Sequence, residues 1–210
     1  MKSFLKKIYN SKFLKDVFPL FLGTGTGQLI LIFSTPFITR LYSPDSFGIL
    51  ALTIAIVSIF TIAANARYEL SIMLPKNDDD AKSIVFLSIF ISLILALFVA
   101  FVLVLIMYFF DRKDELLFLF FIIPAIFLVG IFQALTFWNN RKSRFKKIAI
   151  ANISQTGMTS FTQILLGIFQ FQSLGLLIGY LTGLFLSVIT YTKTKILRIN
   201  YFISSIKFSQ

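Results

Sequence analysis

The stretch from Ser83 to Phe110 reads SIVFLSIFISLILALFVAFVLVLIMYFF and contains no Asp, Glu, Lys or Arg in 28 positions. A membrane-spanning helix needs about 20 mainly apolar residues, so this segment by itself predicts a transmembrane helix. The whole chain of 210 residues is 57% apolar and 14% charged, whereas soluble domains have about 25% charged residues. The composition therefore predicts an integral membrane protein.

Five further stretches on either side of this segment are long and apolar enough to cross a bilayer. The six predicted spans cover 17–39, 47–74, 83–110, 116–138, 148–169 and 173–191. They predict an all-α integral membrane fold, a six-helix transmembrane bundle over 17–191, with no room for a soluble catalytic domain. We expect residues 1–16 to form a cytoplasmic amphipathic N-terminus. Residues 192–210 are expected to form a cytoplasmic amphipathic tail or a linker toward further spans.

The formal net charge of +11 follows the predicted topology. When the loops are assigned to alternate sides of the membrane, 17 of the 20 Lys and Arg residues fall on one side and 3 on the other. Cytoplasmic loops are enriched in Lys and Arg, so both termini are predicted to be cytoplasmic. Because the basic residues are spread along one membrane face, we expect them to meet lipid headgroups and not nucleic acid.

The chain contains no Cys and no His. This excludes disulfides, thiol nucleophiles and Cys or His metal ligands, and it removes the commonest general base. The acidic triplet Asp78-Asp79-Asp80 is most simply the start of the third helix, with metal or nucleotide-sugar phosphate binding as the minor alternative. We therefore expect no cofactor, no metal ion and no enzymatic activity.

The fifth predicted span, 148–169, differs from the others because about half of its residues are polar. A helix that faces lipid would not tolerate Asn152, Gln155 and Gln163. The polar face of this span is therefore expected to look into the bundle or into a cavity.

Two series of glycines predict close contacts between helices, because a residue without a side chain lets two backbones approach. The ordinary interpretation is packing within one chain, and the functional alternative is a surface that slides during a conformational cycle. The two series are Gly23, Gly25 and Gly27 in the first span, and Gly175, Gly179 and Gly183 in the sixth.

Charged residues lie about two turns inside the predicted second span, at Arg67 and Glu69. Arg67 either reaches the headgroups with Glu69 as a local partner, or lines a cationic cavity for an anionic head group. The planar guanidinium suits a diphosphate. The candidate substrate-binding residues are thus Arg67, Glu69, Gln28, Asn152, Gln155 and Gln163, with Arg40 near the outer mouth.

Several segments, taken in order, resemble one family of membrane proteins. They are GQL at 27–29, TPFITRLYSP at 35–44, FG at 47–48, RYELSIMLP at 67–75, DDA at 79–81 and LGLLIG at 174–179. This set resembles the bacterial polysaccharide biosynthesis proteins of the oligosaccharide flippase family, of which O-antigen flippases are members, in the multidrug, oligosaccharidyl-lipid and polysaccharide exporter superfamily. The resemblance implies translocation of undecaprenyl-diphosphate-linked oligosaccharide across the inner membrane by alternating access.

The length departs from this family, whose members have two lobes, and 210 residues suffice for one. The expectation is an N-terminal lobe that is incomplete alone and works with a second copy or a separate chain. The alternatives are a truncated remnant and a membrane scaffold that does not transport. A membrane glycosyltransferase or polymerase is less favoured, since every acidic residue except Glu69 lies in a loop or at a span end.

Overall fold

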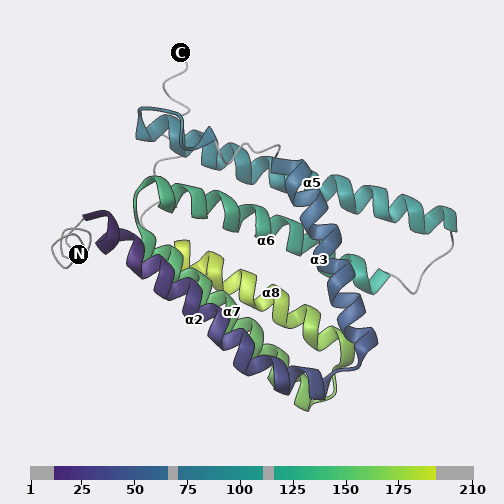
Figure 1. Ribbon diagram of the computed structural model, residues 1–210. Helices are drawn as coiled ribbons and strands as arrows, with labels where there is room; N and C mark the ends of the chain where they lie inside the picture. Colours follow the sequence, from purple (N-terminus) through teal and green to yellow (C-terminus); the bar gives the residue numbers. More distant parts are fainter. Residues whose placement is uncertain (1–11, 66–70, 111–115, 193–210) are drawn as a thin grey trace.

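The computed structural model describes residues 12–65, 71–110 and 116–192. These residues form six helices and, in the ranges described, no strand, which confirms the predicted all-α fold (Figure 1). The helices are α2 (Lys12–Leu41), α3 (Pro44–Asn65), α5 (Asp78–Phe110), α6 (Leu116–Arg141), α7 (Phe145–Ile168) and α8 (Gln172–Thr192). Every one of them except α7 contains a stretch long and apolar enough to cross a membrane. The chain is therefore a multi-pass membrane protein.

Most helices extend a few residues beyond the predicted spans, and α2 begins at Lys12, five residues before its span. Two further differences concern the end of α3 and the start of α5. The second span was predicted to run to residue 74, but α3 is described to Asn65, and residues 72–77 form turns and bends. The third helix begins at Asp78, five residues before the predicted span, because the acidic triplet forms its first turn and complements the helix dipole. Several predicted features lie outside the described residues. These are residues 1–11 of the predicted N-terminal segment, Arg67, Glu69, and residues 193–210 of the predicted tail.

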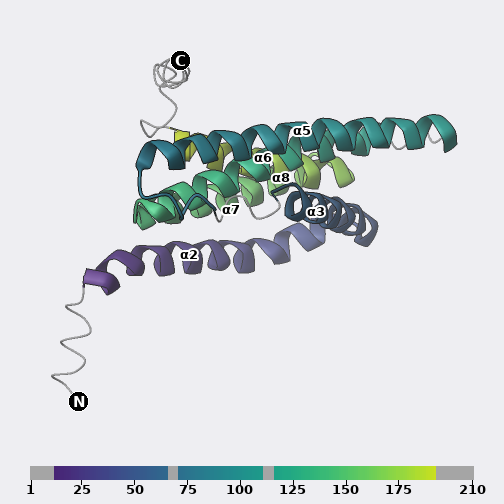
Figure 2. The same ribbon diagram turned by 90° about the horizontal axis from the view of Figure 1, so that it is seen from above.

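The helix α7 lies between α2 and α8 and makes the most extensive helix contacts with these two neighbours (Figure 1). The helices α5 and α6 pack together on the other side of α8, while α2 forms the opposite border of the bundle (Figure 2). The helix α3 crosses α6 and α8 at a steep angle in Figure 1 and is seen nearly end-on in Figure 2. Consequently α7, the most polar helix, is shielded by apolar neighbours on two sides.

Glycines bring these helices close together. A Cβ atom at Gly183 of α8 would lie 2.7 Å from the backbone oxygen of Gln155 in α7, and one at Gly23 of α2 would lie 2.6 Å from Cα of Ala149. Both distances are too short for a real side chain, so these positions require glycine for the observed packing. In contrast, a Cβ atom at Gly25 would meet nothing within 4 Å. Close packing, the ordinary interpretation of the two series, thus holds at Gly183 and Gly23 but not at Gly25.

Tyr42 fastens the end of the bundle where α2 turns into α3. Its buried hydroxyl donates a hydrogen bond to the backbone oxygen of Gln163 in α7 at 2.6 Å, and its ring meets Phe47 edge-on. Ser43 precedes the first residue of α3, and its Oγ accepts a hydrogen bond from the backbone N–H of Ser46 at 3.3 Å. Such a cap satisfies an amide that has no partner inside the helix.

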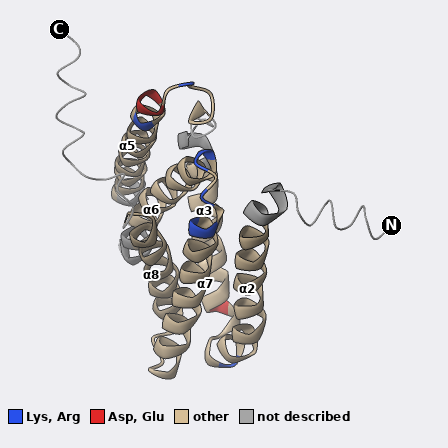
Figure 3. Ribbon diagram, turned by 90° about the vertical axis from the view of Figure 1, so that its left-hand side faces the viewer, with Lys and Arg blue, Asp and Glu red and all other residues tan. Residues whose placement is uncertain are grey.

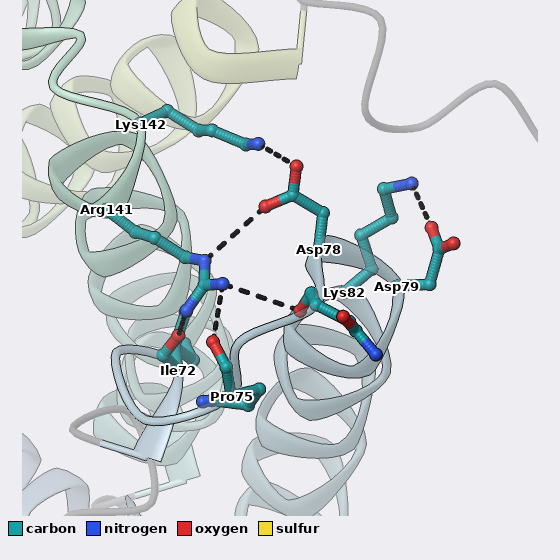
Figure 4. A network of polar contacts seen from close by, with 8 residues as sticks. Ile72, Pro75, Asp78, Asp79, Lys82, Arg141 and Lys142 are labelled. Atoms are coloured by element: carbon teal, nitrogen blue, oxygen red, sulfur yellow. Dashed lines mark hydrogen bonds and ion pairs between the residues drawn. The ribbon is translucent and has the colours of Figure 1, made fainter.

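Arg141, the last residue of α6, closes the opposite end of the bundle (Figure 4). Its side chain is only 13% exposed, and its Nε lies 3.6 Å from Oδ1 of Asp78. The guanidinium also donates hydrogen bonds to three backbone oxygens, those of Ile72 (2.9 Å), Pro75 (2.6 Å) and Asn77 (3.4 Å). We call this set of contacts the Arg141 clasp. It ties the end of α6 to the turn that leads into α5.

Lys and Arg residues lie at this end, around the start of α5 and the loop between α6 and α7 (Figure 3). Lys142 pairs with the second oxygen of Asp78, and its Nζ lies 5.5 Å from the centre of the Trp138 ring. Lys82 pairs with Asp79 at 2.6 Å. The described basic segments before α5 and between α6 and α7 thus meet at one end of the bundle, and the assignment of that end to the cytoplasm stays a prediction.

Gly23→Ala should destabilise the packing of α2 on α7, because its methyl group would overlap Ala149. Overpacking of this kind costs about 1–3 kcal/mol. Gly25→Ala is the matched control in the same helix and should leave stability unchanged or slightly higher, since alanine favours helix. Thermal unfolding of the purified chain in detergent micelles, followed by circular dichroism, measures both. Equal melting temperatures for the two variants would contradict the observed packing.

Arg141→Lys should lower the stability of the protein by weakening the Arg141 clasp. An ammonium group cannot donate hydrogen bonds to three carbonyl oxygens and pair with Asp78 at the same time. Hydrogen bonds to charged groups contribute about 1.5–3 kcal/mol each at most, so we expect a clear drop in melting temperature. Arg144→Lys, on an exposed residue of the same loop, is the control and should have little effect. If both substitutions shift the melting temperature equally, the clasp does not stabilise the fold.

Candidate functional site

A cavity of about 410 Å³ opens between four helices, α2, α3, α7 and α8. Its lining residues lie near the middle of each helix, so the cavity sits halfway along the bundle. They are Thr24, Gly27, Gln28 and Leu31 of α2, Ile54 of α3, Asn152, Gln155, Thr156 and Thr159 of α7, and Tyr180 of α8. The volume falls within the range of about 300–1,000 Å³ that small-molecule sites occupy.

The two main walls of the cavity follow the same helical spacing. The α2 wall runs from Thr24 to Leu31 and the α7 wall from Asn152 to Thr159, each at positions i, i+3, i+4 and i+7. Residues with this spacing lie along one face of a helix. Just before these walls, Gly23, which is one residue before Thr24, closely contacts Ala149, which is three residues before Asn152, and this contact holds the helices together. At Gly27, the missing side chain leaves room beside Thr156, and the cavity opens there.

Three side-chain amides supply most of the hydrogen-bonding capacity of the cavity, those of Gln28, Asn152 and Gln155. Within the described part of the chain, no hydrogen bond engages any of the three side-chain amides. Each amide carries two donor hydrogens and an acceptor oxygen. The hydroxyl of Thr156, in contrast, donates to the backbone oxygen of Asn152 at 3.0 Å. The amides are therefore available to a ligand.

The structure brings together only some of the predicted site residues. Gln28, Asn152 and Gln155 line the cavity, whereas Gln163 lies in the contact between α7 and α8. Its Nε2 donates to the backbone oxygen of Leu176 at 3.1 Å, so this amide serves packing. Arg40 is exposed in the last turn of α2, away from the cavity. Arg67 and Glu69 lie outside the described residues.

Several lining residues were not predicted from the sequence, among them Thr24, Ile54 and Tyr180. Ile54 and Tyr180 are single residues in strongly apolar helices, and nothing in their sequence neighbourhood distinguishes them. Thr24 carries a usable signal, because it lies three and four residues before Gly27 and Gln28 and so continues their helical face. The matching spacing in the fifth predicted span would have revealed the second wall.

The acidic triplet at the start of α5 faces cations. Asp78 meets Arg141 and Lys142, and Asp79 meets Lys82. In the described ranges, no group of three or more Asp or Glu residues is arranged to hold a metal ion. The triplet thus contributes to the structure of this end of the bundle through the ion pairs that it forms.

Comparison with known proteins matches the chain to a protein family. Residues 37–209 fit the model of a family described as polysaccharide biosynthesis protein, while no curated protein and no solved structure matches the chain. The matched segment begins in the last turn of α2 and includes α3 and every later helix, and therefore the α3, α7 and α8 walls of the cavity. It covers well over half of the chain, which therefore belongs to the polysaccharide biosynthesis protein family.

Proposed function

We propose that the chain is a component of a flippase that moves undecaprenyl-diphosphate-linked glycan across the bacterial inner membrane by alternating access. In this role the protein carries a substrate and catalyses no covalent step. The observation that carries the proposal is a cavity halfway along a bundle of membrane-type helices, with side-chain amides and hydroxyls in a mostly apolar lining. Membership of the polysaccharide biosynthesis protein family supports a glycan as the cargo.

The polar head group is the physical obstacle to such transport, because its many hydroxyl groups find no hydrogen-bond partners in hydrocarbon. Each hydroxyl transferred into an apolar medium without a hydrogen-bond partner costs several kcal/mol, about 4–8 by the strictest reference. A cavity lined by free amides replaces water as the partner at the depth where the cost is greatest. Substrate sites of transporters commonly lie near the bilayer midplane for this reason.

The packing of α2 supports a moving element at this site. The helix makes its extensive contact with α7 alone, through small residues such as Gly23 and Ala149. Its remaining surface is apolar and exposed, with Phe21, Phe33 and Phe37 among the largest side chains. A helix held mainly on one face can change its tilt by rearranging that contact and the small cluster that Ile38 forms with Tyr42 and Leu176, as transport by alternating access requires.

The orientation follows from the distribution of charge. We place the end that carries the Arg141 clasp in the cytoplasm, because basic loops stay on that side. The cavity then receives its substrate from the cytoplasmic leaflet and releases it toward the outer leaflet. Assembly with a second copy or with another chain is part of the proposal, since alternating access works between two bodies around a central site.

Filling the cavity should stop export. Gly27→Phe places an aromatic ring between the two polar walls, and Gly25→Phe places the same ring on the open side of the same helix. In cells that depend on this chain for surface polysaccharide, we expect Gly27→Phe to lower the surface polysaccharide at least roughly tenfold, which corresponds to about 1.4 kcal/mol in the barrier. Lipid-linked precursor should accumulate inside these cells.

Gly25→Phe should export at the rate of the unmodified chain, and membrane levels of both variants should be compared by immunoblotting. Unchanged export by Gly27→Phe at a normal protein level would contradict transport through this cavity. Loss of export in both variants at normal levels would point to disturbed packing of α2 as the cause.

A further inference from the structure

The absence of charged residues among the described residues that line the cavity distinguishes the diphosphate of a lipid-linked glycan from its sugar units as ligands. The described residues around the cavity offer amides, threonine hydroxyls, a phenol and aliphatic groups, and none of them is Asp, Glu, Lys or Arg. A diphosphate is recognised by Arg and Lys through charge-assisted hydrogen bonds. An anion placed among neutral groups would lose its hydration without gaining a cation, which is costly.

Three described cations on the helices near the cavity, Lys147, Arg141 and Arg40, are not part of its lining. Lys147 precedes Asn152 by five residues in α7, so it lies about 140° around the helix from the cavity wall. Arg141 is occupied by three backbone oxygens and Asp78. Arg40 lies in the last turn of α2, about three turns beyond Gln28. A phosphate held by any of these three side chains would therefore lie outside the cavity.

The same lining suits an uncharged sugar. Sugar hydroxyls both donate and accept hydrogen bonds, as the amides of Gln28, Asn152 and Gln155 do. These amides come from two facing helices, so one sugar ring between the walls is within reach of both. Tyr180 and Leu31 add apolar surface for the carbon-bound face of the ring. The proportions of the lining, mostly apolar with a few placed polar groups, are typical of small-molecule sites.

We propose that this cavity binds an uncharged sugar unit of the glycan through its hydroxyl groups, and that the diphosphate lies outside it. This assignment rests on the proposed function and narrows the substrate to glycans with a neutral unit at the site. A unit with a carboxylate or phosphate is disfavoured, because the cavity offers it no counter-charge among the described residues.

Binding measurements on the purified full-length chain in nanodiscs test the assignment. The probes are undecaprenyl diphosphate alone, the same lipid carrying one N-acetylglucosamine, and the same lipid carrying one glucuronic acid. We expect N-acetylglucosamine to tighten binding at least roughly tenfold over the bare lipid, the gain from about one or two hydrogen bonds. Glucuronic acid should give no such gain.

Two substitutions in the α7 wall should remove the gain while leaving the affinity for bare undecaprenyl diphosphate unchanged. They are Gln155→Leu, which deletes an amide, and Thr156→Val, which preserves shape and deletes a hydroxyl. That hydroxyl donates to the backbone oxygen of Asn152, but its oxygen can still accept a hydrogen bond from a sugar. The matched control is Thr35→Val, since the hydroxyls of Thr35 and Thr156 both bond the carbonyl four residues earlier, but Thr35 is exposed outside the cavity. Melting temperatures of all variants show that the fold is intact.

Three results would overturn the assignment. Equal loss of affinity for the bare lipid in Gln155→Leu would place the diphosphate in the cavity. A gain with glucuronic acid equal to that with N-acetylglucosamine would show that charge is not discriminated. Absence of any sugar-dependent gain in the unmodified chain would exclude a sugar site. Export in cells is measured independently, so a chain that exports without this gain retains the proposed function and loses only the sugar assignment.

Discussion

Everything in this bundle depends on one constraint, which is that α7 is too polar to face lipid and must be enclosed by other helices. The helices α2 and α8 enclose α7 by packing closely against it, and glycines make this close packing possible on both sides of α7. Gly183 lets α8 reach the backbone of Gln155, and Gly23 lets α2 reach Ala149. The two apolar neighbours cover the polar side chains of α7, and beyond Lys146 the side chains that α7 leaves exposed are apolar, namely Ile150, Phe161, Leu165 and Ile168. The enclosure also explains the cavity, since polar side chains that avoid lipid must face either each other or a water-filled space.

The two ends of the bundle are closed by the same kind of contact, a side chain that donates to backbone oxygens of a distant segment. Tyr42 bonds the carbonyl of Gln163 at one end, and Arg141 bonds the turn from Ile72 to Asn77 at the other. The carbonyls of Ile72 and Pro75 lie outside the helices and lack helical partners, whereas the carbonyl of Gln163 lies inside α7 and has a second lone pair for the Tyr42 hydroxyl. These contacts therefore fix the ends, while the middle of the bundle, where the cavity lies, is left without cross-links among the described side chains that line it.

The six helices follow from hydropathy, because an apolar run of bilayer length has few alternatives to a helix. The polar wall of α7 was also predictable, since half of that span is polar. Which residues of this wall line the cavity was not predictable. Gln163 lies on the same helical face as Asn152, but Tyr42 and the backbone of α8 at Gly179 pack directly against it. Periodicity predicts which face of a helix a residue lies on. It does not predict which part of that face borders a cavity, because this depends on neighbours far away in sequence. The steep crossing of α3 and the contribution of Tyr180 depend on tertiary packing in the same way.

The spacing of the α2 glycines has a consequence for motion. Gly23 and Gly27 are four residues apart, so a shift of α2 along its axis by one helical turn, about 5.4 Å, brings a second glycine opposite Ala149. After such a step Leu31 would stand where Gly27 now lies beside Thr156. The glycine spacing thus preserves the close contact at Ala149 in both registers, while the cavity wall beside Thr156 would change from glycine to leucine and the cavity would narrow there.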